Sequence, residues 1–351
     1  MTALRDEYDG LLLDLDGTLY RGRDAVPHAV ESIRNAPKTR PLYITNNASR
    51  SVSDVAEHLS ELGFPVCPAN VVTSAQAAAA LVAELVPAGA RVLVVGTEAL
   101  AAEITDAGLK PVREVTDAPE AVVQGHSPYT DWSVLAEAAL AIRAGAVWVA
   151  ANLDATLPTE RGLLPGNGSM VAALRTATDR TPHVAGKPGA QIFHSAVTRA
   201  GLSAPLVVGD RLDTDIAGAH AAGLPSLYVM TGVSQPLDVL LAAPAQRPDF
   251  LAEDLRCLAQ SAAELRPRPQ ADWKVTRTLT TVTVEALANT ACEIGALRAI
   301  AAEVWIQAEP DWKKLVIRGT AAHHVLQTWP GHVGVSRGEG ASPSVSVEFD
   351  D

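Results

Sequence analysis

The chain is predicted to have an α/β fold built around a mostly parallel sheet. Short apolar runs alternate with helix-like segments from residue 10 to residue 230, and Gly or Pro residues separate them. Such alternation favours right-handed crossovers that join neighbouring parallel strands. The apolar runs also lack the polar alternation of a half-exposed strand, as expected for strands that are buried on both faces.

Each expected strand is a short apolar run that ends at a turn. These runs cover residues 10–15, 40–45, 90–96, 120–125, 146–152, 204–210 and 225–230. Each expected helix has apolar residues at helical spacing. The helices are expected at residues 25–36, 51–63, 98–108, 132–145 and 214–223, with one more beginning just after Lys187. The segment 51–63 has clear limits, because Ser51 precedes its first turn and Gly63 ends it.

The chain changes character after a proline-rich stretch at residues 264–273, which is expected to be a linker. Beyond it, a run rich in Thr and Val is followed by a helical stretch and another strand-like run. We therefore predict a separate C-terminal α+β module over residues 266–351, a size that folds alone only marginally. Residues 337–351 are expected to be either a final strand or disordered.

Composition and charge exclude several classes of partner. The net charge is −12, so nucleic acid and anionic membranes are disfavoured as partners. The sequence shows neither the apolar core of a signal peptide nor an apolar run of membrane length. Cys67, Cys257 and Cys292 lie far apart, which is typical of reduced thiols. We therefore expect a cytoplasmic protein.

Two aspartates follow the first apolar run directly. Asp14 and Asp16 precede Gly17 and Thr18, and ligands of parallel α/β sheets bind beyond the carboxyl ends of the strands. A carboxylate pair at such a place needs a compensating cation or hydrogen bonds. Taken alone, this pattern is also typical of a strand-to-turn junction with capping aspartates.

Three other motifs stand near ends of expected strands or the start of a helix. The Thr-Asn-Asn sequence at residues 45–47 offers hydroxyl and amide groups that suit phosphate oxygens. Lys187 can present a positive charge to a phosphate or a carboxylate. Asp210, Asp213 and Asp215 follow another strand, and such a cluster of oxygen ligands suits Mg²⁺.

Taken together and in this order, the four motifs resemble those of the haloacid dehalogenase superfamily of phosphotransferases. The matching residues are DLDGT at 14–18, TNN at 45–47, Lys187 and GDRLDTD at 209–215. The resemblance covers about residues 8–260 and implies a Rossmann-like parallel-sheet core.

The long interval between the second and third motifs resembles the large α/β cap of the type II members. This resemblance implies a phosphatase core over residues 1–84 and 183–265, interrupted by an inserted cap domain over residues 85–182. The subgroup includes glycerol-3-phosphate, phosphoglycolate, pyridoxal and nitrophenyl phosphatases. The module at residues 266–351 lies outside the resemblance.

The resemblance also implies a reaction and a metal site. Asp14 is expected to attack phosphorus and form an aspartyl-phosphate, and Asp16 to protonate the leaving group and then activate water. Mg²⁺ is expected to be bound by the Asp14 carboxylate, the Asp16 backbone carbonyl and Asp210. Asp215 is expected to orient these ligands from behind.

Further residues are expected to hold the substrate. Thr45 and Lys187 are expected to act on the transferred phosphoryl group, by hydrogen bonding and by charge balance. The other expected contacts come from the core and from polar residues of the cap: Gly17, Asn46, Asn47, Asn152 and His126. A solvent-facing loop position is an equal alternative for His126, and Asp154 is expected to cap a turn.

The sequence favours a Mg²⁺-dependent phosphatase of a small polar phosphomonoester, with glycerol 3-phosphate as the first candidate. Phosphoglycolate and pyridoxal phosphate stay open as alternatives, although the few aromatic residues of the cap favour an aliphatic substrate. A phosphomutase, a phosphonatase and a non-enzymatic binding or regulatory protein are further alternatives. The C-terminal module is interpreted as a dimerisation element, a degenerate acyltransferase-like domain or a regulatory module, so a homodimer also stays open.

Overall fold

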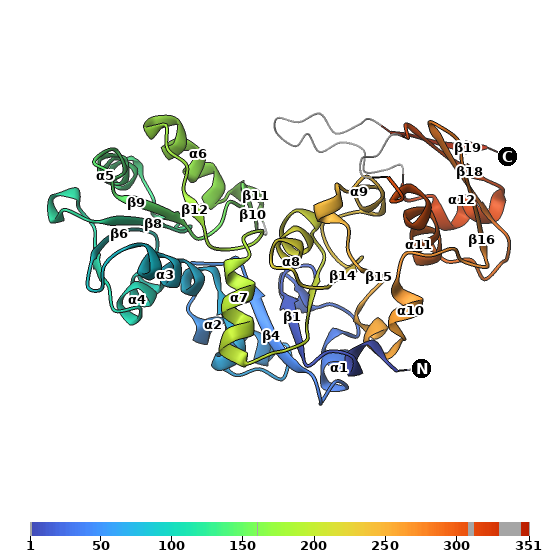
Figure 1. Cartoon of the computed structure of the whole chain (residues 1–351), viewed down its shortest axis with the longest axis horizontal. Coiled ribbons are helices and arrows are strands. Elements are labelled where there is room, and N and C mark those ends of the chain that lie inside the picture. The colour runs from blue at the N-terminus through green and yellow to red at the C-terminus, as the bar shows by residue number, and fades with distance from the viewer. Residues whose placement is uncertain (1, 160, 308–311, 330–344, 351) are drawn as a thin grey trace.

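The computed structural model describes residues 2–159, 161–307, 312–329 and 345–350. Its three larger sheets follow one another along the longest axis of the molecule (Figure 1). The core sheet lies in the middle, with the cap on one side and the C-terminal module on the other. The predicted α/β fold, with a Rossmann-like parallel core, a cap and a C-terminal module, is confirmed. The domain boundaries themselves stay a prediction.

Six parallel strands form the core sheet, in the order β15–β14–β13–β1–β4–β5. Their bounds are β1 Gly10–Asp14, β4 Arg40–Thr45, β5 Val71–Thr73, β13 Pro205–Gly209, β14 Ser226–Val229 and β15 Phe250–Ala252. Strand β1 pairs with β4 on one side and with β13 on the other. The carboxyl ends of these three strands therefore meet at one edge, where a parallel sheet binds its ligands.

Both faces of the core sheet are buried, as its apolar runs predict. Leu12 belongs to the apolar cluster on one face, whereas Leu11 and Leu13 belong to the cluster on the other. All three are at most 1% exposed. This alternation follows from the period of two residues along a strand.

Helices follow most of the strands. Their bounds are α1 Ala29–Arg34, α2 Val52–Glu61, α3 Ser74–Leu85, α4 Glu98–Asp106, α5 Trp132–Arg143, α6 Asn167–Thr178, α7 Gln191–Ala200, α8 Ala217–Ala221, α9 Pro236–Leu240, α10 Ala262–Leu265, α11 Glu293–Val304 and α12 Thr320–Leu326. The helix expected at residues 25–36 is shorter, because His28 before α1 has a left-handed backbone with φ 66°. A π-helical turn at Leu212–Ile216 precedes α8.

The cap sheet has five parallel strands in the order β12–β9–β8–β6–β7. Their bounds are β6 Arg91–Val95, β7 Lys110–Val112, β8 Ala121–Gln124, β9 Val147–Ala150 and β12 His183–Val184. An antiparallel hairpin, β10 Thr156–Thr159 and β11 Gly162–Pro165, was not predicted. Helix α3 joins the cap to the core, because its Ala78 shares one apolar cluster with Leu42 of the core and Val94 of the cap.

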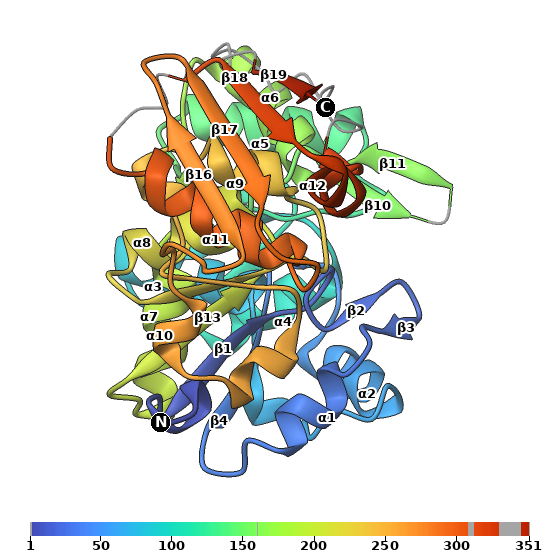
Figure 2. The same cartoon turned by 90° about the vertical axis from the view of Figure 1, so that its right-hand side faces the viewer.

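The C-terminal module is a mixed four-stranded sheet with helices α11 and α12 packed against it (Figure 2). Its strands are β16 Trp273–Arg277, β17 Thr281–Ala286, β18 Lys314–Arg318 and β19 Ser346–Asp350. Helix α11 also contacts α9 and β15 of the core. The predicted α+β character is confirmed, and a final strand is present at β19. Residues 337–344 of the predicted tail lie outside the described residues.

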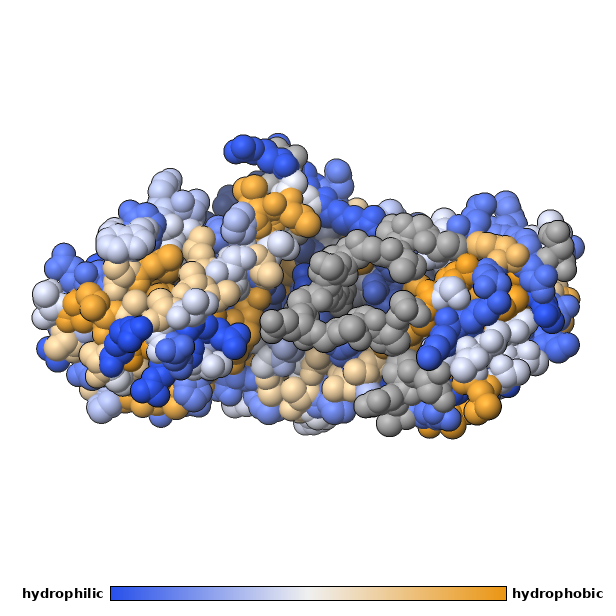
Figure 3. Space-filling model, turned by 90° about the horizontal axis from the view of Figure 1, so that it is seen from above, coloured by the Kyte–Doolittle hydropathy of each residue, from blue (hydrophilic) through white to orange (hydrophobic). Residues whose placement is uncertain are grey.

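Within the described ranges, no helix is both long and apolar enough to cross a bilayer. On the face seen from above, hydrophobic side chains form several separate groups with hydrophilic side chains between them (Figure 3). The large exposed apolar residues are spread over the chain, and include Tyr129, Trp132, Leu163, Leu279 and Ile306. Scattered apolar side chains of this kind are ordinary on protein surfaces.

One apolar cluster joins the C-terminal module to the core. It contains Tyr228 and Leu251 of the core sheet together with Trp273 and Leu297 of the module, and each of these residues is at most 4% exposed. Removal of the module would expose the core side of this cluster to water. Each Å² of apolar surface exposed in this way costs about 25 cal/mol of folding free energy.

We therefore expect a chain that ends at residue 265 to melt at a lower temperature than the full chain in differential scanning fluorimetry. It should also bind more of the hydrophobic dye before it unfolds. The full chain with Leu279→Ala is the control, because Leu279 is 87% exposed, and it should melt as the unchanged protein does. Equal melting temperatures for the truncated and full chains would contradict a shared core.

Candidate active site

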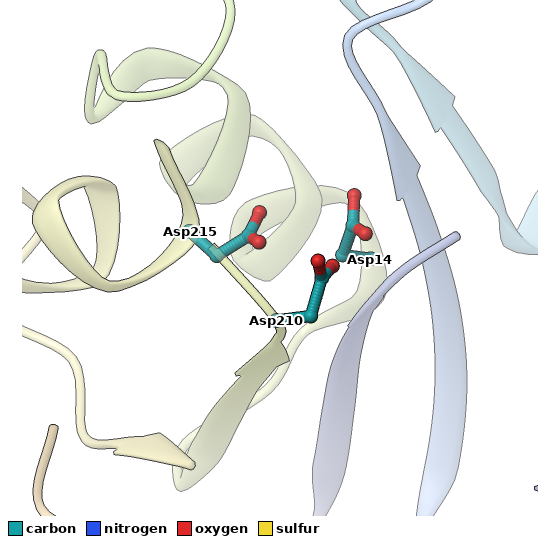
Figure 4. A group of neighbouring side chains, drawn as sticks. All are labelled: Asp14, Asp210 and Asp215. Carbon is teal, nitrogen blue, oxygen red and sulfur yellow. The ribbon is translucent and has the colours of Figure 1, made fainter. Parts of the chain in front are cut away.

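Three carboxylates converge at the carboxyl edge of the core sheet. Asp14 is the last residue of β1, Asp210 follows β13 directly, and Asp215 lies in the π-helical turn. Their side chains point toward one another (Figure 4), and one oxygen of each lies within 4.8 Å of the others. The structure thus brings together three of the predicted site residues.

Lys187 bridges two of these carboxylates. Its Nζ donates a short hydrogen bond to Asp14 Oδ1 and another of 2.7 Å to Asp215 Oδ1. The lysine side chain is only 4% exposed. Burial alone would lower the pKa of Lys187, but the charges of Asp14 and Asp215, and the hydrogen bonds to them, raise it above its usual value. Lys187 is therefore held in its charged form.

The balance of charge in this cluster fits a divalent cation. Burial, and then the nearby charges of Asp14 and Asp215, raise the pKa of the Asp210 carboxyl. Burial, and then the charge of Asp14, also raise the pKa of Asp215. When all three carboxylates are ionised, the one positive charge of Lys187 cannot balance them. Mg²⁺ prefers carboxylate oxygens as ligands, so these residues fit it in both charge and donor type.

The arginine beside the cluster has an acidic partner of its own. Arg211 donates to Asp213 through Nε at 3.2 Å and through a terminal nitrogen at 2.9 Å. Asp213, the third acid of the sequence motif, is thus engaged in this pair. Asp210 and Asp215 are the acids of the motif that join Asp14.

Thr18 connects the carboxylates of Asp14 and Asp210. Its Oγ1 lies 3.3 Å from Asp14 Oδ2 and 3.2 Å from Asp210 Oδ1. A hydroxyl group has one proton, so Thr18 can donate to only one of the two carboxylates at a time. Thr18 lies inside the DLDGT motif but was not predicted as a site residue, and its place in that motif is the signal that points to it.

A backbone donor and two glycines fix the orientation of Asp210. The N–H of Val233 donates to Asp210 Oδ2 at 2.6 Å. A Cβ on Gly232 would lie 1.9 Å from the same oxygen, and a Cβ on Gly17 would lie 2.6 Å from it. Only glycine allows the backbone to approach this closely. Gly17, predicted to contact phosphate, is thus also required for the packing of the carboxylate cluster.

Asn46 clamps the backbone of Lys187. Its Oδ1 accepts from the Lys187 N–H at 2.8 Å, and its Nδ2 donates to the Lys187 carbonyl at 3.0 Å. The same Nδ2 lies 3.3 Å from both carboxylate oxygens of Asp154. The amide group of Asn46 therefore has protein partners for its donors and its acceptor. Its predicted contact with phosphate stays a prediction.

A loop of the cap places Asp154 beside Asn46. Asn152 Nδ2 donates to the Asn46 carbonyl at 2.6 Å, and Asn167 Nδ2 donates to the Asn152 carbonyl at 2.8 Å. The N–H of Gly168 donates to the Asp154 carbonyl at 2.9 Å. The Asp154 carboxylate contacts Asn46, and the expectation that Asp154 caps a turn stays a prediction. Burial also raises the pKa of this carboxyl.

Asp16 stands apart from the carboxylate cluster. Its Oδ2 accepts a hydrogen bond of 3.3 Å from the Tyr20 hydroxyl, and its side chain keeps contact with solvent. The surrounding protein still removes enough water to raise the pKa of Asp16, against the opposing effects of the Tyr20 hydrogen bond and the Lys187 charge. A raised pKa makes the protonated form more available, which suits an acid that meets a substrate.

The remaining predicted residues have partners of their own near the site. Thr45 Oγ1 accepts from the Asn47 N–H at 3.1 Å, and Asn47 Oδ1 accepts from the Ser49 N–H at 2.7 Å. His126 Nδ1 lies 3.3 Å from Ser49 Oγ, and burial lowers the pKa of this histidine. These contacts describe a turn at the core–cap junction. The predicted substrate contacts of Asn47 and His126 stay predictions.

Comparison with known sequences identifies relatives over the core and over the whole chain. A family model described as haloacid dehalogenase-like hydrolase matches residues 11–110, and a second one, described as HAD-hydrolase-like, matches residues 184–258. The chain is 52% identical to the D-glycerol 3-phosphate phosphatase of Mycobacterium tuberculosis, over 94% of this chain and 96% of that protein. It is 38% identical to the acid sugar phosphatase of Staphylococcus aureus, over 66% of this chain and 90% of that protein.

Solved structures give the same relationships. The crystal structure of a glycerol phosphate phosphatase from Mycobacterium tuberculosis in complex with magnesium has a TM-score of 0.89 and 52% identity, covering 94% of this chain and 99% of that chain. The 4-nitrophenylphosphatase of Thermotoga maritima has a TM-score of 0.68 and 28% identity, covering 74% of this chain and all of that one. This chain therefore contains sequence that the latter protein lacks.

We expect Mg²⁺ to raise the melting temperature of the protein after treatment with EDTA. One bound ion, at about 100 times its Kd, would add about 2.7 kcal/mol to the free energy of unfolding. Asp210→Asn should lose this rise. In the absence of metal it should melt no lower than the unchanged protein, because the substitution removes a like charge from a buried cluster.

Differential scanning fluorimetry with and without Mg²⁺ measures both effects. Asp213→Asn is the matched control from the same motif, because Asp213 pairs with Arg211 outside the cluster, and it should keep the rise. A full Mg²⁺ response in Asp210→Asn would rule out this metal site.

Proposed function

Because the chain belongs to the haloacid dehalogenase-like hydrolase family, we propose that it is a Mg²⁺-dependent phosphatase that hydrolyses glycerol 3-phosphate. The observation that carries the proposal is the contact of Lys187 with Asp14 inside a cluster of three carboxylates. Phosphoryl transfer depends on positioning and charge stabilisation more than on a strong nucleophile. The choice of glycerol 3-phosphate is supported by the 52% identity to the mycobacterial enzyme over nearly the whole chain.

In the first step, Asp14 attacks phosphorus, and the bond between phosphorus and the ester oxygen breaks as an aspartyl-phosphate forms. The leaving oxygen takes a proton from Asp16, whose raised pKa favours the protonated form. Lys187 offsets the negative charge of the phosphoryl oxygens. Asp215 keeps the ammonium group of Lys187 in place through its 2.7 Å contact.

In the second step, Asp16 removes a proton from a water molecule, whose oxygen attacks phosphorus as the bond between phosphorus and the Asp14 oxygen breaks. Inorganic phosphate leaves and the Asp14 carboxylate is restored. When bound, Mg²⁺ supplies the positive charge that lets two anions approach each other. The Asp14 carboxylate, Asp210 and the Asp16 carbonyl would hold it, and Asp215 would orient these ligands.

The remaining residues position the substrate and exclude water. We propose that Thr45, Gly17 and Asn47 contact the phosphoryl group, and that Asn152 and His126 line the cap side of the site. Asn46 acts mainly through Lys187, because its amide group holds the backbone of that residue. Its link to Asp154 ties the cap to the core, and a closed cap strengthens electrostatic interactions by excluding water.

The proposal includes a cytoplasmic location and a small-molecule substrate. Cys67, Cys257 and Cys292 are all free thiols, which suits a reducing compartment. A homodimer stays a prediction, and size-exclusion chromatography with light scattering would test it.

The substrate is tested by phosphate release from a panel of phosphomonoesters. We expect glycerol 3-phosphate to have the highest kcat/KM, ahead of phosphoglycolate, pyridoxal phosphate and a hexose phosphate. Asp14→Asn should lower kcat by roughly a thousandfold or more, because it removes the nucleophile. Asp213→Asn is the control and should retain activity. A higher kcat/KM for phosphoglycolate or pyridoxal phosphate would overturn the substrate, and an active Asp14→Asn would overturn the mechanism.

The role of Asp16 is tested by the leaving group. Asp16→Asn should lower kcat for glycerol 3-phosphate by roughly 100-fold or more, because an alkoxide needs a proton as it departs. For 4-nitrophenyl phosphate the loss in the first step should be much smaller, because nitrophenolate is stable without a proton. A rapid release of nitrophenolate before slow turnover is therefore expected in stopped-flow absorbance. Equal losses in this first step for both substrates would exclude Asp16 as the acid.

A further inference from the structure

We infer that Arg298 of the C-terminal module is a positioning residue for the metal ligand Asp210, acting through β15, β14 and the segment that follows β14. The inference rests on the proposed function in one respect, namely that Asp210 binds Mg²⁺. It gives the C-terminal module a role in this active site, although none of the module's described side chains belongs to the carboxylate cluster.

The first link is the segment at residues 231–235, which wraps around Asp210. Val233 donates its N–H to Asp210 Oδ2 at 2.6 Å, and Ser234 donates its N–H to the Asp210 carbonyl at 3.2 Å. The backbone at Gly232 approaches so closely that a Cβ there would lie 1.9 Å from Asp210 Oδ2. A small displacement of this segment would therefore move the carboxylate.

The second link anchors this segment to β14. The hydroxyl of Tyr228 donates to the Ser234 carbonyl at 2.5 Å, and the Leu212 N–H donates to Ser234 Oγ at 3.1 Å. Tyr228 is completely buried. Its position thus sets the position of Ser234, one residue beyond the donor to Asp210.

The third link runs from β14 to the module. Tyr228 pairs with Leu251 across the parallel strands β14 and β15. Strand β15 is the edge of the core sheet, and the guanidinium of Arg298 donates to the Leu251 carbonyl through Nε at 3.0 Å and a terminal nitrogen at 2.6 Å. The module thus satisfies a backbone acceptor at the sheet edge, directly beside the residue that anchors the Asp210 segment.

The apolar surroundings strengthen this connection. Tyr228 and Leu212 belong to the cluster that also contains Ile294, one turn before Arg298 on α11. On the core side, Arg247 donates to the Trp305 carbonyl at 3.1 Å, just after the end of α11. Helix α11 therefore contacts the core at α9 and β15, and Arg247 holds the residue just after its end. Groups that orient a metal ligand commonly affect metal affinity although they do not touch the metal.

The test measures Mg²⁺ binding directly, by isothermal titration calorimetry on the full-length protein without substrate. Arg298→Met keeps the aliphatic part of the side chain but cannot donate to Leu251. Tyr228→Phe keeps the ring but cannot donate to Ser234. Loss of a direct partner of a metal ligand typically weakens metal binding by about 10- to 100-fold. Because both substitutions act at a distance from Asp210, we expect a smaller effect, a rise of about 3- to 10-fold in the Kd for Mg²⁺ in each variant.

Arg277→Met is the matched control. Arg277 is also a half-buried arginine of the module, and it donates to the Glu303 carbonyl at 3.3 Å, within the module itself. This variant should bind Mg²⁺ as the unchanged protein does, even if its melting temperature falls. Arg298→Lys, which keeps one charged donor, should recover part of the lost affinity.

Kinetics gives a second measurement. The Mg²⁺ concentration for half-maximal activity should rise in Arg298→Met and Tyr228→Phe, while kcat at saturating Mg²⁺ stays near that of the unchanged protein. Unchanged Mg²⁺ affinity in both variants, or an equal loss in Arg277→Met, would overturn the inference and leave the proposed function intact. If the unchanged protein neither binds Mg²⁺ nor releases phosphate, the proposed function fails as well.

Discussion

The site depends on an excess of negative charge that the fold places at one edge of a buried sheet. One oxygen each of Asp14, Asp210 and Asp215 lies within 4.8 Å of the others, and Lys187 contacts Asp14 and Asp215. Like charges at this distance repel strongly where water is scarce. Around Asp210, the Thr18 hydroxyl and the Val233 N–H serve as hydrogen-bond partners, and two glycines leave room for the carboxylate. A divalent cation would offset the remaining repulsion between the carboxylates.

Lys187 reaches the site although a long insertion separates it in the sequence from the first two motifs. Lys187 lies 141 residues beyond Asn46, and the whole cap separates them in the sequence. Two hydrogen bonds between the Asn46 amide and the Lys187 backbone close this interval. The contact is costly in chain entropy, so it is supported on both sides, by Asn152 on the Asn46 carbonyl and by Asp215 on the lysine ammonium. The clamp gives Asn46 a structural role beside its predicted contact with phosphate.

The strands and the acidic residues of the site could be predicted from the sequence because their signals are local. Apolar runs mark strands such as β1, and parallel order places the acids that follow them at one edge. Contacts set by tertiary structure were harder to predict. Thr18 lies in the DLDGT motif, but its contact with Asp210 joins residues 192 positions apart, and the contact of Asp154 with Asn46 joins residues 108 positions apart. The hydrogen bond of Arg298 to Leu251 likewise joins residues that are 47 positions apart.

The alanine-rich helix α3 limits how the cap can move. Its residues share one continuous apolar layer with Leu42 of the core and Val94 of the cap, and it contacts α4 and β9 on one side and α7 on the other. A wide hinge rotation would open that layer to water. Small side chains, however, let packed surfaces slide past each other by short distances. Substrate entry is therefore expected to occur by shear of the cap over α3, a motion of small amplitude that suits a compact ester and would hinder a bulky one.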